Sequence, residues 1–137
     1  MSTSLLSLLG FTAWTLLLVL GVVTYRSGLV LAGRRRANDW QRAKPSEDPG
    51  FVQRLAHAHA NCLENLPLFA SVVLVASATG KLGITDPLAG WYLALRIGQS
   101  AVHLTGISHW QVFIRFSFFL PQLLILGWMV VRLSGVF

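Results

Sequence analysis

The sequence has few charged residues. Only 12% of its 137 residues are Asp, Glu, Lys or Arg, about half the fraction that is usual in a soluble domain. Hydrophobic side chains make up 54% of the chain, and the mean hydropathy is +0.61. This composition excludes an ordinary soluble domain and predicts one small integral membrane domain over residues 1–137.

The chain also has little cysteine and no basic region at its N-terminus. Cys62 is the single cysteine, so no intrachain disulfide can form, and we interpret this side chain as a small buried hydrophobe within a helix. No basic residue precedes the first apolar stretch, which is longer than the core of a signal peptide. We therefore expect a retained membrane span there rather than a cleaved leader.

Four apolar stretches are long enough to be considered as membrane spans. A helix needs about 20 residues to cross the hydrocarbon core of a bilayer. The predicted spans are residues 5–31, 52–79, 87–107 and 112–134. The sequence thus predicts an all-α integral membrane protein, a bundle of four transmembrane helices.

Basic residues are distributed unevenly between the two sides of this predicted bundle. The loop after the first span carries most of them, and the connection between the third and fourth spans is flanked by two more. The opposite side has only Lys81 and Arg132. The residues on the basic side are Arg34, Arg35, Arg36, Arg42, Lys44, His109 and Arg115. By the positive-inside bias, both termini should lie on the non-cytoplasmic side. Because the run of three arginines adjoins a span, this topology explains it, and we expect no nucleic-acid partner.

Polar residues inside two of the predicted spans are the candidate functional residues. On the second span they recur at intervals of three and four, which places them on one helical face; they are Arg54, His57, Asn61, Glu64 and Asn65. The third span carries Arg96, Gln99 and His103. A charge at the centre of a bilayer helix costs roughly 2.5 to 3.5 kcal/mol or more, so such residues normally face one another, a ligand or water. The two polar faces therefore predict a shared interior site.

Other interpretations of these polar residues remain open. Glu64 and Arg96 could pair only to stabilise the bundle, or they could form an ion relay with His103 in a small transporter. His59 lies off the polar face, and we interpret it as a helix-contact residue. No metal site is expected, because the chain has no H-E-x-x-H pattern and no two histidines four residues apart.

The segment from Arg54 to Phe69 carries a family resemblance. Its Asn-Cys-x-Glu-x-x-Pro-Leu-Phe pattern resembles the second-helix signature of the MAPEG family, the membrane-associated proteins in eicosanoid and glutathione metabolism. It is similar in particular to the leukotriene-synthesising and microsomal glutathione transferase branches. Arg96, Gln99 and His103 of the third span, and Arg115 near the start of the fourth, are also placed as in that family. The length and loop pattern resemble those of bacterial members, which implies a multi-pass protein of the bacterial inner membrane.

The resemblance implies a homotrimer that binds glutathione, as a co-substrate, between adjacent subunits near the cytoplasmic side. By this resemblance Asn61 and Glu64 would hold the amino group and backbone of glutathione, and Arg96 would support Glu64 or the ligand. Arg34 could meet a carboxylate of the tripeptide. His57, Gln99 and His103 complete the implied binding set. Arg115 would be the catalytic residue, because a nearby cation favours the ionised, nucleophilic form of a thiol.

Some positions depart from the family pattern. His57 stands where related enzymes usually carry arginine, and family tyrosines are replaced by Gln99 or His103 and by Phe119. The expected function is that of a glutathione-dependent transferase or peroxidase acting on a hydrophobic electrophile that arrives from the membrane lipid. The alternative is a non-catalytic lipid- or glutathione-binding scaffold protein.

Overall fold

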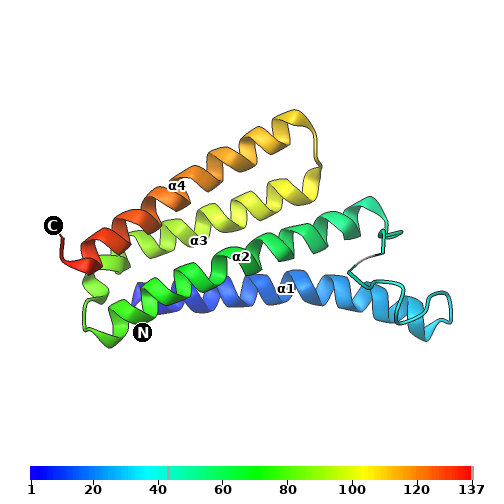
Figure 1. Cartoon of the computed structure of the whole chain (residues 1–137), viewed down its shortest axis with the longest axis horizontal. Helices are drawn as coiled ribbons and strands as arrows, with labels where there is room; N and C mark the ends of the chain where they lie inside the picture. Colours follow the sequence, from blue (N-terminus) through cyan, green and yellow to red (C-terminus); the bar gives the residue numbers. More distant parts are fainter. Residues whose placement is uncertain (43, 137) are drawn as a thin grey trace.

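The computed structural model describes residues 1–42 and 44–136, and these form four helices with no strand among them. The helices are α1 (Thr3–Leu31), α2 (Gly50–Ala78), α3 (Leu82–Thr105) and α4 (His109–Ser134). They lie side by side, and both termini are at one end of the bundle (Figure 1). The long α1–α2 loop and the short α3–α4 connection lie at the other end, so the basic residues of both connections share that end.

Three of the four helices are long and apolar enough to cross a membrane. These are α1, α2 and α4. Helix α3 has 24 residues but is less apolar, so three of the four predicted spans meet the length and hydropathy expected of a membrane span. The reason is the set of polar side chains that α3 buries, namely Thr85, Arg96, Gln99, Ser100 and His103. Because α3 packs against each of the other helices, these groups lie inside the bundle.

Helix α3 also begins earlier than the predicted span, at Leu82 rather than at residue 87. Pro87 lies within the helix, in its second turn, where it cannot donate the backbone hydrogen bond that another residue would make there. Asp86 accepts hydrogen bonds from the backbone N–H of Ser4 at 2.8 Å and from its hydroxyl at 2.6 Å. A carboxylate at the start of α1 is favourable for the helix dipole, so this contact joins the starts of α1 and α3.

An aromatic cluster holds the first three helices together. The rings of Phe69 and Tyr92 are stacked with centroids 4.3 Å apart, and Phe11 lies 6.3 and 6.2 Å from them. All three residues are at most 1% exposed. This packing fixes the face of α2 and the face of α3 that are turned toward α1, and therefore the faces left for other contacts.

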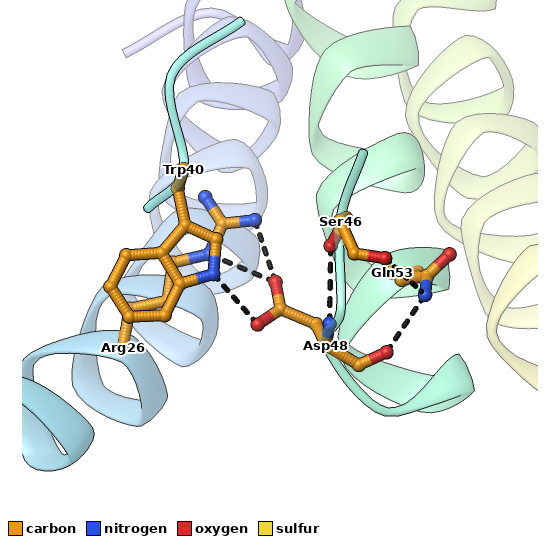
Figure 2. Close-up of polar contacts among 5 residues, drawn as sticks. All are labelled: Arg26, Trp40, Ser46, Asp48 and Gln53. Atoms are coloured by element: carbon orange, nitrogen blue, oxygen red, sulfur yellow. Dashed lines mark hydrogen bonds and ion pairs between the residues drawn. The ribbon is translucent and has the colours of Figure 1, made fainter. Parts of the chain in front are cut away.

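The α1–α2 loop is folded back onto the end of α1 by Asp48. The carboxylate accepts hydrogen bonds from Arg26 Nη2 at 2.8 Å and Nε at 3.1 Å, and from the indole N–H of Trp40 at 2.8 Å (Figure 2). The Arg26 guanidinium also lies 5.4 Å from the centre of the Trp40 ring. Burial alone would raise the pKa of Asp48, but these hydrogen bonds and the charge of Arg26 outweigh it and lower that pKa. We call these three residues the loop clasp.

Candidate functional site

A groove of about 470 Å³ lies between α2, α3 and α4, toward the end that carries the α1–α2 loop and the α3–α4 connection. It contains five of the eight residues predicted for the site. The lining consists of His57, Ala60, Asn61 and Glu64 from α2, His103 and Ile107 from α3 and its end, and Val112 and Arg115 from α4. Side chains that are up to 58 positions apart in the sequence thus meet at one place.

Asn61 is held in a defined orientation by Arg96. Arg96 Nη1 donates a hydrogen bond of 2.6 Å to Asn61 Oδ1. The oxygen of the Asn61 amide is therefore occupied, and its NH₂ group is the part left to serve a ligand. An amide NH₂ can only donate, so it suits a carbonyl or carboxylate oxygen.

Arg96 itself lies inside the bundle rather than on the groove. Its side chain is fully buried, and its guanidinium is 5.6 Å from the ring centre of Phe11 and 6.0 Å from that of Phe119. Within residues 1–42 and 44–136, its Nε and Nη2 atoms have no hydrogen-bond partner. Arg96 thus acts on the groove through Asn61.

The pair of Glu64 and Arg96, which the sequence left open as an alternative, is not among the ion pairs of the described residues. The ion pairs in the described part of the chain are Arg26 with Asp48 and Arg35 with Glu47. Glu64 lies exposed on the groove side of α2, whereas Arg96 is turned into the bundle. The Glu64 carboxylate consequently remains available for a cationic group of a ligand.

The other half of the groove carries positive or titratable nitrogen groups. Arg115 is half-buried, and its Nε has no hydrogen-bond partner among the described residues. The rings of His57 and His103 lie with their centres 6.3 Å apart. Arg54 lies behind them and donates from Nε to the carbonyl oxygen of Leu104 at 2.9 Å. A half-buried cation that has no ion pair in the described part of the chain favours the binding of an anion.

Besides Arg96, two other predicted residues lie outside the groove. Gln99 is 6% exposed, and its Oε1 accepts a hydrogen bond of 3.0 Å from Gln122 of α4. It is therefore a contact between α3 and α4. Arg34 is exposed in the turn after α1, beside a separate hollow of the α1–α2 loop.

The sequence analysis missed Gln122 and the apolar lining of the groove. Gln122 is 1% exposed, and an amide in the middle of an apolar span was a sign of a helix contact that could have been recognised. The apolar residues of the groove could not be recognised from the sequence, because apolar residues are common throughout a membrane segment. They are Ala60, Ile107 and Val112. Their position on the groove follows only from the packing of the three helices.

The groove therefore combines a carboxylate, an amide NH₂, two imidazoles and a guanidinium whose Nε has no partner among the described residues, together with apolar walls. Such a set fits a zwitterionic ligand that has an ammonium group, carbonyl or carboxylate oxygens and an additional anionic atom. Its open side allows an apolar molecule to reach the bound ligand.

Comparison with known proteins gives one result. The model of the MAPEG family matches residues 4–135, which is nearly the whole chain. No curated protein and no solved structure matches. The family resemblance stated from the second-helix pattern is thereby confirmed.

Proposed function

The chain belongs to the MAPEG family, and we propose that it is a membrane-bound transferase or peroxidase that uses glutathione as its co-substrate. The observation that carries this proposal is the groove itself, where Glu64, Asn61 and Arg115 meet from α2 and α4. Each of these side chains matches one chemical group of the tripeptide.

The binding roles follow from the chemistry of the groove. Glu64, without an ion pair in the described part of the chain, would receive the glutathione ammonium group. Asn61 has its oxygen occupied by Arg96, so it would donate its NH₂ to a backbone carbonyl or carboxylate. His57 and His103 would border the rest of the tripeptide. These contacts orient glutathione and place its sulfur toward Arg115.

Arg115 is the proposed activating residue. A free thiol has a pKa of about 8.5 and is mostly protonated at neutral pH. Lowering that pKa by about 2 units requires about 2.7 kcal/mol of preferential stabilisation of the thiolate. A half-buried guanidinium with an unpartnered Nε is suited to supply it, because arginine stays charged and the surroundings partly exclude water. The thiolate would then attack a hydrophobic electrophile that arrives from the membrane lipid.

The exposed polar face of α2 supports a homotrimer. His57 and Glu64 are exposed on a helix that is apolar enough to cross a membrane. Facing lipid, a charged group there would cost several kcal/mol. A neighbouring copy of the chain would cover this face and complete the glutathione site. Both termini would lie on the non-cytoplasmic side, since the basic connections share the other end.

Spectroscopy and turnover of the purified protein test the proposal. In mild detergent, glutathione should give the ultraviolet absorbance of a bound thiolate, and a generic aromatic electrophile should be conjugated. Arg115→Ala should remove the thiolate signal and slow conjugation about 100-fold, the rate equivalent of 2.7 kcal/mol, with less effect on glutathione affinity. Arg115→Lys should restore part of the signal, because it keeps the charge without the planar guanidinium.

Arg132→Ala is the control, since Arg132 lies near the other end of the same helix. It should behave as the wild type. If thiolate persists in Arg115→Ala, another group activates the sulfur. If the wild type binds glutathione but forms no thiolate and turns over no electrophile, the enzyme proposal fails.

That last result would support a glutathione- or lipid-binding protein without catalysis. One observation favours this second function: none of the side chains that line the groove in the described structure has a hydroxyl group. Hydroxyl donors are a common means of stabilising a developing negative charge, and their absence leaves Arg115 to do so without their help.

A further inference from the structure

Two hollows at the end of α1 and the start of the α1–α2 loop are not used by the glutathione proposal. Both are formed by the short stretch of residues 26–40, at the end of the bundle where the basic connections lie. The first, the apolar hollow, has a volume of about 480 Å³ and is lined by Arg26, Ser27, Val30, Leu31, Ala37 and Trp40. The second, the basic hollow, has a volume of about 450 Å³ and is lined by Gly33, Arg34, Arg35, Arg36 and Asp39.

The basic hollow has cations in excess over carboxylates. Arg35 pairs with Glu47 at 2.5 Å, and Asp39 accepts a hydrogen bond from the backbone N–H of Arg36 at 2.9 Å. Within residues 1–42 and 44–136, neither Arg34 nor Arg36 has an ion pair. Two guanidinium groups are thus free to bind an anion. Arginine presents several donors in a planar fork, which matches the oxygens of a phosphate group.

The apolar hollow lies where the membrane-spanning helix meets its loop. Leu31, the last residue of α1, is 88% exposed, which is unfavourable in water but suits the boundary between acyl chains and headgroups. Trp40 forms a wall of this hollow, and tryptophan is enriched at that level of a membrane. Its ring is fixed by the loop clasp, in which Asp48 accepts the indole N–H and Arg26 lies against the ring face (Figure 2). The hollow is therefore preformed rather than dependent on the ligand.

The geometry points to a binding site for an anionic phospholipid on the α1–α2 loop, with the phosphate of the headgroup at Arg34 and Arg36 and the adjoining glycerol and acyl carbons against Leu31 and Trp40. A lipid suits the pair of hollows better than a soluble phosphate does, because a soluble phosphate would use only the basic one. This lipid binding differs from the general preference of a basic loop for the cytoplasmic side. It depends on two particular guanidinium groups, those of Arg34 and Arg36, and on the fixed indole of Trp40.

Lipid retention by the purified protein tests this inference. The wild type is exchanged in mild detergent with phosphatidylglycerol or phosphatidylcholine, and bound lipid is counted by native mass spectrometry. Detergent removes any effect of membrane orientation on the result. Phosphatidylglycerol should bind more tightly than phosphatidylcholine, and added salt should weaken it because the contact is a partly exposed ionic one. Glycerol phosphate at equal concentration should not displace it.

Three variants locate the site. Arg34→Gln/Arg36→Gln should weaken binding of phosphatidylglycerol about 30-fold, from roughly fivefold for each arginine lost near an anionic headgroup. Trp40→Ala should weaken binding of both lipids, because it removes the apolar wall. Lys81→Gln, a cation at the opposite end of the bundle, is the matched control and should leave binding unchanged. The double arginine variant should have the same helix content as the wild type, because both arginines are exposed.

Three results would overturn the inference, and the first two concern lipid retention. One is equal retention of the two lipids by the wild type. The other is equal loss of phosphatidylglycerol binding in Lys81→Gln and in the double arginine variant, which would show that only net charge matters. Displacement of the lipid by glycerol phosphate would instead show a site for soluble phosphate esters and would refute the lipid assignment.

Discussion

Asn61 and Arg96 are coupled, and removing the Asn61 side chain should destabilise the protein far more than replacing Arg96 by an apolar side chain. Arg96 is fully buried, and of its side-chain nitrogens Nε and Nη2 have no hydrogen-bond partner in residues 1–42 and 44–136. The 2.6 Å bond from Nη1 to Asn61 Oδ1 is therefore its principal polar contact. A hydrogen bond to a charged group contributes about 1.5 to 3 kcal/mol, and a buried charge left without it loses at least that much. Asn61→Ala should thus destabilise the protein by about 2 to 3 kcal/mol.

Arg96→Met should have a much smaller effect. Methionine keeps an unbranched chain among Phe11 and Phe119 while removing the buried charge and its desolvation cost. Replacing a buried ionic group by an apolar one of similar volume is often neutral or stabilising. The double variant Asn61→Ala/Arg96→Met should accordingly be more stable than Asn61→Ala by about 1 to 3 kcal/mol, although it has lost more native contacts.

The measurement is a double-mutant cycle of unfolding in mixed micelles, followed by circular dichroism. Asn38→Ala is the control, because Asn38 is exposed in the α1–α2 loop. If Asn61→Ala unfolds with the same free energy as the control, within about 0.5 kcal/mol, Arg96 does not depend on Asn61. The prediction would also be wrong if the double variant were no more stable than Asn61→Ala. The loss of stability in Asn61→Ala would then come from lost packing rather than from a buried charge without its hydrogen bond.

Three further results are expected. Glu64→Gln should weaken glutathione binding by roughly 1 to 3 kcal/mol in calorimetry while the oligomer stays intact, because it removes the carboxylate proposed for the ammonium group; unchanged affinity would exclude Glu64 from the site. The wild type should have the mass of a trimer in mild detergent, and a stable monomer would argue against a site shared between subunits. Because the pKa of Asp48 is lowered in the folded protein, the unfolded chain takes up the proton first. The loop clasp should therefore stabilise the protein above the ordinary aspartate pKa of about 3.9 and lose this effect as the pH falls through the lower folded value. Thermal unfolding scans should show this pH dependence of stability in the wild type. The control variant Glu47→Gln should show it too, because the Glu47 side chain is 71% exposed, whereas Asp48→Asn should show a weaker pH dependence.

Hydropathy was sufficient to predict the helices but not where one of them begins. The segment around Asp86 and Pro87 has neither the apolarity of a span nor the proline-free composition of an ordinary helix, so the predicted third span begins only at residue 87. The structure places it in α3, because Ser4 of α1 donates two hydrogen bonds to Asp86. A contact between residues 82 positions apart leaves no local pattern in the sequence.

Helical periodicity was informative about faces and uninformative about partners. His57, Asn61 and Glu64 share a face of α2, as their spacing requires, and that face borders the groove. The same reasoning grouped Gln99 with Arg96, yet Gln99 contacts Gln122 of α4 instead. Spacing along one helix states which residues point the same way. Which neighbour they meet depends on how the helices pack, and this is a property of the whole bundle.

The polar residues of α2 and α3 differ in how they avoid lipid. Those of α3 are surrounded by the other three helices, which explains how a helix of lower hydropathy can belong to a membrane bundle. His57 and Glu64 of α2 are exposed on the surface of a single chain, and no side chain in the described structure pairs with Glu64. Since a carboxylate facing lipid is costly, something outside the chain must cover it. A neighbouring subunit would cover the face, and a bound ammonium group would neutralise the charge, so assembly and ligand binding should stabilise each other.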